Sequence, residues 1–101
     1  MTFTPSPLVG AYMVDLQPFS DERGWFARYF CKNEFQAIGH TKEWVQMNQS
    51  VSFAKGTLRG MHFQYPPFQE AKLIRCVAGA VYDVIIDLRQ GSSTFLQWFG
   101  M

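Results

Sequence analysis

Residues 81–88 read Val-Tyr-Asp-Val-Ile-Ile-Asp-Leu and form the strongest strand signal in this chain of 101 residues. β-branched and aromatic side chains suit a pleated, half-buried surface. Runs of this kind recur along the chain, and turn-forming residues such as Gly, Pro, Asn and Asp separate many of them. Turns are expected at 21–24, 54–56, 66–67 and 90–93. Short strands at this spacing predict an all-β sandwich or barrel. The strands are expected at 8–16, 25–30, 44–52, 58–64, 70–77, 81–88 and 94–99.

One short helix is expected among the strands. Asn33 is a candidate N-terminal cap for a helix over residues 34–38, and Gly39 can supply the left-handed conformation that follows many helix ends. With 48% hydrophobic residues the chain has material for one core but is too short for two. We therefore expect a single domain over residues 1–101.

Charge and composition exclude several classes of function. A net charge of only +1 gives no broad basic surface for nucleic acid or an anionic membrane. No run approaches the ~20 apolar residues of a membrane helix, and no secretory signal is present, so a cytoplasmic protein is expected. Cys31 and Cys76 are expected to be buried and reduced. Ten Phe, three Trp and four Tyr exceed what a small core needs, which predicts apolar surface shared in an oligomer.

His62 and Lys72 flank a predicted turn at Pro66 and Pro67, residues that cannot continue a strand ladder. If the turn is centred near Pro67, the two side chains face each other across a hairpin, with Cβ atoms roughly 5 Å apart. A neutral imidazole beside an ammonium suits proton abstraction. The alternative is that His62 is an ordinary core histidine.

Asp83 lies in the middle of the strongest predicted strand, between apolar neighbours. A carboxylate buried there would need a partner, and such groups are usually paired or functional. The alternative is that Asp83 faces solvent from the outer side of a sheet. Asp87 and Arg89, at the end of the same strand, are interpreted as ordinary surface charges.

Several blocks of this sequence together resemble the dTDP-4-dehydrorhamnose 3,5-epimerases, a family of cupin-type sugar-nucleotide epimerases. The similarity begins near Leu8 and corresponds to the N-terminal part of a family member. It implies an incomplete cupin, that is, a double-stranded β-helix or jelly roll, with one short helix. The matching blocks are Asp21 to Phe26, Gln46 to Asn48, Leu58 to Gln64, Lys72 to Cys76, Gly79, and Val81 to Arg89.

The resemblance implies an isomerase of dTDP-rhamnose biosynthesis that acts without a cofactor on a thymidine-diphosphate 4-keto-6-deoxy sugar. His62 would remove a proton from a carbon next to the ketone, and Lys72 would stabilise the enolate oxygen. Asp83 would orient the imidazole or tune its basicity. The implied substrate-binding residues are Arg23 and Arg59, at the diphosphate, and Gln46 and Asn48, along the cleft. The alternative for the two amides is ordinary cross-strand hydrogen bonding.

Some features depart from the family pattern. Arg28 stands where many members have a glutamate that contacts the nucleotide, and Met47 replaces a commoner polar residue. None of the four tyrosines matches the family's proton donor, which lies in its second half. The alternatives are therefore a related 3-epimerase or ketoisomerase, or a non-catalytic sugar-nucleotide-binding module.

Two further expectations concern metals and assembly. Metal-binding cupins carry a second histidine two residues after the first, and here that position is Gln64, so no metal is expected. The family exchanges N-terminal strands between subunits, which implies a homodimer paired through the apolar run Leu8 to Leu16.

Overall fold

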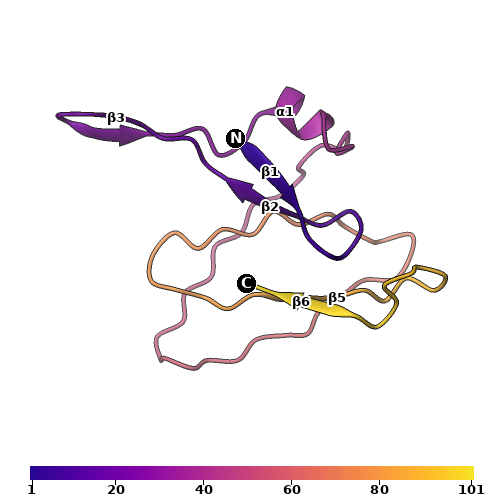
Figure 1. The fold of residues 1–101 in the computed structure, drawn as a ribbon. Helices are drawn as coiled ribbons and strands as arrows, with labels where there is room; N and C mark the ends of the chain where they lie inside the picture. Colours follow the sequence, from indigo (N-terminus) through magenta and orange to yellow (C-terminus); the bar gives the residue numbers. More distant parts are fainter. The chain divides into compact units, whose positions relative to one another are not determined.

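The computed structural model describes residues 1–101 and contains six short strands and one short helix (Figure 1). The strands form three separate antiparallel hairpins. Residues 1–43 and 81–101 make up one compact unit, and residues 44–80 make up the other. The elements are β1 (Thr2–Pro5) with β2 (Tyr12–Asp15), β3 (Phe19–Asp21) with β4 (Gly24–Phe26), α1 (Lys32–Gln36), and β5 (Val84–Ile86) with β6 (Trp98–Gly100).

The hairpin of β1 and β2 begins earlier in the chain than the sequence pattern predicts. The expected strand over residues 8–16 forms only from Tyr12, because the preceding residues make a loop. Ser6 N donates to Ala11 O at 2.9 Å, and Gly10 takes a φ of +85° within this loop. Strand β1 was not predicted, since four residues are too few to show a clear alternation.

Helix α1 starts one residue after Cys31, whose backbone is extended at φ −148° and ψ 121°. Cys31 O accepts the first helical hydrogen bond from Phe35 N at 3.0 Å. The prediction that Asn33 caps the helix is therefore wrong, because Asn33 already lies inside it. The prediction for Gly39 is confirmed, since this residue has a φ of +84° just beyond the helix. Its N–H donates to Gln36 O at 3.0 Å.

Substituting Gly39 by alanine is expected to destabilise the chain by about 1–2 kcal/mol, because a Cβ is disfavoured in the left-handed region. No atom lies within 4 Å of where that Cβ would stand, so the cost comes from the backbone conformation and not from a clash. Urea unfolding followed by circular dichroism measures the change. Gly39→Asn is the matched control and should lose less, because asparagine tolerates this conformation. Equal losses in the two variants would contradict this explanation.

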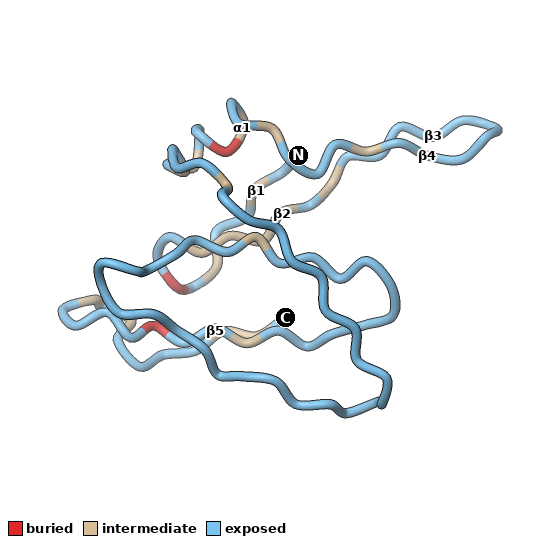
Figure 2. Tube along the Cα trace, turned by 180° about the vertical axis from the view of Figure 1, so that it is seen from behind, coloured by how far each residue is buried: buried red, intermediate tan, exposed pale blue.

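Phe35 is the centre of a small aromatic core and is only 4% exposed. Its ring centroid lies 5.2 Å from that of Phe3, 5.1 Å from that of Phe30 and 6.0 Å from that of His40. Leu8 is the other buried apolar residue, and buried positions are correspondingly rare along the trace in Figure 2. The core is smaller than the composition predicts, because most of the aromatic side chains are at the surface.

Residues 44–80 contain no strand and no buried residue (Figure 1, magenta to orange). The strands predicted at 44–52, 58–64 and 70–77 are therefore not formed, because a strand requires a neighbour that completes its hydrogen-bond ladder. The turns predicted between them are present. Thr57 Oγ1 donates to Ala54 O at 2.7 Å, and Phe68 N donates to Tyr65 O at 2.9 Å. Local turn chemistry thus persists where strand pairing does not.

The two cysteines are free thiols, but neither is buried as predicted. Cys31 is partly exposed beside the helix start, and Cys76 is exposed. No helix has the length and apolar character that crossing a membrane requires.

Candidate functional site

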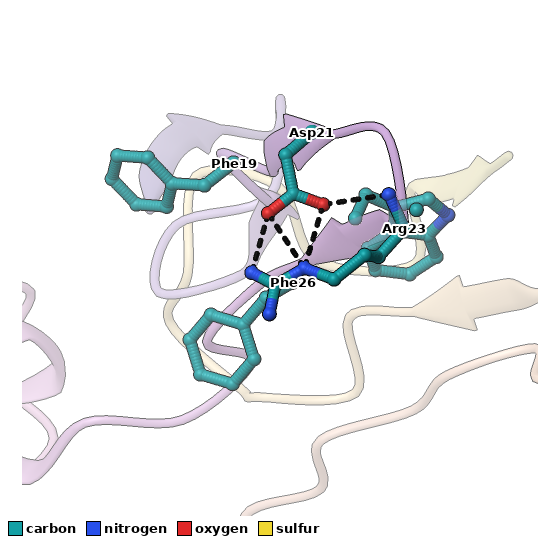
Figure 3. A pocket seen from close by; sticks show the side chains of 6 residues that line it. Phe19, Asp21, Arg23 and Phe26 are labelled. Atoms are coloured by element: carbon teal, nitrogen blue, oxygen red, sulfur yellow. Dashed lines mark hydrogen bonds and ion pairs between the residues drawn. The ribbon is translucent and has the colours of Figure 1, made fainter.

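Arg23 lies at the tip of the hairpin formed by β3 and β4, where Glu22 and Arg23 form the turn between paired Asp21 and Gly24. The turn predicted at residues 21–24 is thus confirmed. Arg23 Nη2 donates to Asp21 Oδ2 at 2.6 Å, and Arg23 N donates to Asp21 Oδ1 at 2.9 Å (Figure 3). The side-chain hydrogen bonds, and then the backbone one, hold the pKa of Asp21 below its usual value.

A shallow pocket of about 270 Å³ surrounds this ion pair. Its walls include the rings of Phe19 and Phe26, which are paired across the two strands and remain largely exposed. Figure 3 shows the Arg23 guanidinium turned toward Asp21, with both rings nearby. A guanidinium next to aromatic faces can hold an anionic group together with a flat ring.

Arg59 lies in the other unit and is held by the preceding loop. Its Nη2 donates to Val51 O at 3.0 Å, and its Nε donates to Ser52 Oγ at 3.3 Å. These bonds join the guanidinium to the segment that precedes the turn at Ala54 to Thr57. Arg59 is therefore oriented by its own loop and is still exposed to solvent.

His62 is exposed, so the interpretation of this residue as a buried core histidine is wrong. Lys72 Nζ forms an ion pair with Glu70 Oε1 at 3.1 Å, and this is its electrostatic partner within the chain. The turn between the two residues is present, but no ladder joins its flanks. The hairpin expected to place His62 opposite Lys72 is therefore not formed in this chain. That the two residues act together stays a prediction.

Gln46 and Asn48 are exposed in a stretch without regular secondary structure, where they alternate along the sequence with the apolar residues Val45 and Met47. Neither side chain hydrogen-bonds within the chain. Ordinary cross-strand hydrogen bonding, the plain structural role for these residues, is absent.

Asp83 extends the hairpin of β5 and β6 by one pair. Its N–H donates to Met101 O at 2.9 Å, and its C=O accepts from Met101 N at 3.0 Å. The residue is exposed, in agreement with the alternative that its carboxylate faces solvent in this chain. Asp83 and His62 belong to different units.

Asp87 is the acid that the sequence interpretation missed. It is buried, with 4% of its surface exposed, and its carboxylate accepts hydrogen bonds from Arg89, Ser92 and Thr94. These donors, Arg89 first, hold the pKa of Asp87 far below its usual range. The interpretation of Asp87 as a surface charge is wrong. The signal that could have revealed its role is the arginine two residues later, followed by hydroxyls five and seven residues after the acid.

Arg28, the position at which the sequence departs from the resembled family, is held by helix α1. Its Nη1 lies 3.3 Å from Glu34 Oε1, and Glu34 Oε2 also accepts from the amino group of Met1 at 2.9 Å. The amino group and Arg28 together lower the pKa of Glu34. No three His, Cys, Asp or Glu side chains gather where they could share a metal ion.

Comparison with known proteins identifies the family. The family profile described as dTDP-4-dehydrorhamnose 3,5-epimerase matches residues 5–101. The chain belongs to this family. A dTDP-4-dehydrorhamnose 3,5-epimerase of Shigella flexneri is 48% identical over 84 residues, which are 82% of this chain and 46% of the relative. One of Pseudomonas aeruginosa PAO1 is 47% identical over 81% of this chain and 45% of its own length.

Solved structures of epimerases in this family show the same fold. The crystal structure of the enzyme from Elizabethkingia anophelis NUHP1 matches all of this chain and 55% of its own, at 38% identity and a TM-score of 0.94. That from Bacillus anthracis, with TDP and PPi bound, matches 99% of this chain and 57% of its own, at 40% identity and a TM-score of 0.93. The predicted class, an incomplete all-β cupin with one short helix, is confirmed. The chain spans about half the length of these relatives.

Proposed function

We propose that this chain serves, as the N-terminal part of the family's domain, in epimerising a thymidine-diphosphate 4-keto-6-deoxy sugar in dTDP-rhamnose biosynthesis. The observation that carries the proposal is a structural match. A solved epimerase with TDP and PPi bound superposes on 99% of this chain with a TM-score of 0.93. All the predicted site residues fall within the matched residues 5–101. The chemistry is proton abstraction from a carbon next to the ketone, and it needs no cofactor.

The proposed catalytic residues are His62, Lys72 and Asp83. The exposed imidazole of His62 is accessible to substrate and acts as the base. Lys72 supplies a positive charge to the enolate oxygen, and its contact with Glu70 uses only one of its three N–H donors. Asp83 is the third proposed catalytic residue, with the role of orienting the imidazole that the family resemblance implies.

The proposed substrate-binding residues are Arg23, Arg59, Gln46 and Asn48. Arg59 is already oriented by its hydrogen bonds to Val51 and Ser52. Its side chain therefore loses less conformational entropy when it binds a phosphate oxygen. Arg23 is engaged by Asp21, so a phosphate competes with that carboxylate for its donors. The two amides present donors and acceptors to the sugar nucleotide.

The proposed assembly is a homodimer in the cytoplasm. Strands β1 and β2 form a two-stranded sheet, so each has an edge whose backbone groups can pair with another strand. The exposed aromatic residues, Phe19 and Trp25 among them, are suited to contact with a second subunit.

Incubation with the 4-keto sugar nucleotide in heavy water tests the activity. Mass spectrometry and NMR of the recovered sugar are expected to show deuterium at ring carbons next to the ketone, and the number of labelled carbons separates a 3,5-epimerase from a 3-epimerase. A longer version of the protein with the family's remaining residues is assayed in parallel. Binding without exchange in both proteins would instead support the non-catalytic binding module, which the half-length match makes a real alternative.

A further inference from the structure

The Asp87 carboxylate is saturated by donors that follow it in the chain. Its Oδ1 accepts from Arg89 N at 3.0 Å and from Arg89 Nε at 2.8 Å. Its Oδ2 accepts from Arg89 Nη2 at 2.8 Å, Ser92 Oγ at 2.6 Å and Thr94 Oγ1 at 2.7 Å. Hydrogen bonds to a buried charge are the strong ones, so this carboxylate organises the segment that joins β5 to β6.

The backbone of Asp87 is bound to the returning strand as well. Asp87 N donates to Gln97 O at 2.9 Å, and Asp87 O accepts from Leu96 N at 2.7 Å. Leu96 has a φ of 62°, a left-handed conformation that a leucine adopts only where its surroundings hold it. The carboxylate and the backbone of Asp87 thus fix where the chain turns back.

That turning point sets the register of the two strands. Ile86 pairs with Trp98, Val84 pairs with Gly100, and the ladder ends at Asp83 and Met101. A slip of one residue would reverse the side on which every side chain lies. The far end of the ladder agrees with this register, because Tyr82 covers Gly100 so closely that a Cβ there would overlap its hydroxyl.

We infer that Asp87 is a positioning residue, which sets the register of β5 and β6 and thereby fixes the side of the strand on which Asp83 lies. The two acids are four residues apart on one strand and so share a side. The role of Asp83 in catalysis rests on the proposed function, whereas the control of register does not. Asparagine cannot replace Asp87, because its amide NH₂ would face donors from Arg89 and the hydroxyls.

NMR of the 101-residue chain tests the register directly. In the parent we expect cross-strand nuclear Overhauser effects between Asp83 and Met101, which Asp87→Asn should abolish. The exchange of the Asp83 and Met101 amides with solvent should accelerate at least about tenfold, the factor that corresponds to one lost charge-assisted hydrogen bond. The amide of Phe35 reports whether the core stays folded. Ser93→Ala is the control. The hydroxyl of Ser93 is exposed and lies next to Ser92 in the sequence, but it does not bond to Asp87.

Two milder variants keep the test decisive if Asp87→Asn fails to fold. Thr94→Val and Ser92→Ala each remove one donor to the carboxylate and should give smaller changes at the same two amides. Cross-strand signals that persist in all three variants would overturn the inference. If the parent itself shows no cross-strand signals between Asp83 and Met101, the inference is overturned as well, because the register on which it rests would be wrong.

The exchange assay with the sugar nucleotide separates positioning from general stability. Asp87→Asn is expected to lower the rate of deuterium incorporation at saturating substrate about tenfold and to leave KM unchanged. The double variant of Asp83→Asn and Asp87→Asn should be no slower than Asp83→Asn alone, because both changes act through one group. Additive losses would show that Asp87 does not act through Asp83. A parent without exchange in either length of protein would refute the proposed function, and the NMR result would still decide the register.

Discussion

Replacing His62 by asparagine is expected to reduce deuterium incorporation from heavy water into the sugar by about 10²- to 10⁴-fold, the usual contribution of a positioned general base. Asparagine keeps a similar size and polarity but cannot take up a proton near neutral pH. Because His62 is exposed and makes no hydrogen bond within the chain, the substitution should not disturb folding. The initial rate of label uptake by parent and variant, measured in the longer protein, gives the ratio.

His40→Asn is the control, because it removes the other histidine of the chain. Its label uptake should match that of the parent, provided that circular dichroism shows an intact fold. Binding of the thymidine-diphosphate sugar should survive in His62→Asn, since the arginines and amides proposed for binding are untouched. Label uptake by His62→Asn at the parent rate would refute His62 as the base.

Replacing Phe35 by alanine is expected to lower the free energy of unfolding by about 3–5 kcal/mol, the range found when a buried phenylalanine is truncated. The cost is large because Phe35 is the residue on which Phe3, Phe30 and His40 converge. A loss of this size approaches the total stability of many small domains. Urea titration followed by far-ultraviolet circular dichroism should show the midpoint fall sharply or the transition disappear.

Phe53→Ala makes the same chemical change at a side chain that is 101% exposed. Its unfolding midpoint should stay at the parent value, because no packing is lost. Equal destabilisation of the two variants would mean that the aromatic cluster around Phe35 is not the core of its unit.

Apart from the fold class, most of the features that the sequence predicted correctly are local ones. Gly39 ends its helix, residues 21–24 turn a hairpin, and a turn follows Tyr65, because each depends on the backbone preferences of a few adjacent residues. The strands at 44–52, 58–64 and 70–77 failed for the opposite reason. A ladder is a property of two segments, and side-chain alternation in one segment does not supply the partner.

The candidate site divides in the same way. Sequence blocks such as Leu58 to Gln64 pointed to the family, and the comparisons confirm it. The residues of a block do not, however, predict which side chains contact one another. The ion pairs of Arg23 with Asp21 and of Lys72 with Glu70 join residues two positions apart, and neither was predicted. Asp87 was misjudged because charge at a strand end is usually solvated, and its burial depends on donors from the following loop.

The absence of any buried residue in 44–80 has a thermodynamic consequence for recognition. The residues proposed as the base, as the cation for the enolate oxygen and as one of the phosphate-binding arginines are His62, Lys72 and Arg59, and all three lie on this backbone. Fixing each residue in a single conformation costs about 1–2 kcal/mol, and no buried side chain here offsets that cost. The ordering free energy is therefore subtracted from whatever the substrate or a neighbouring polypeptide gains by contact. The affinity for the sugar nucleotide would then depend on two quantities. One is how well the ligand fits, and the other is how much of this backbone is ordered before the ligand binds.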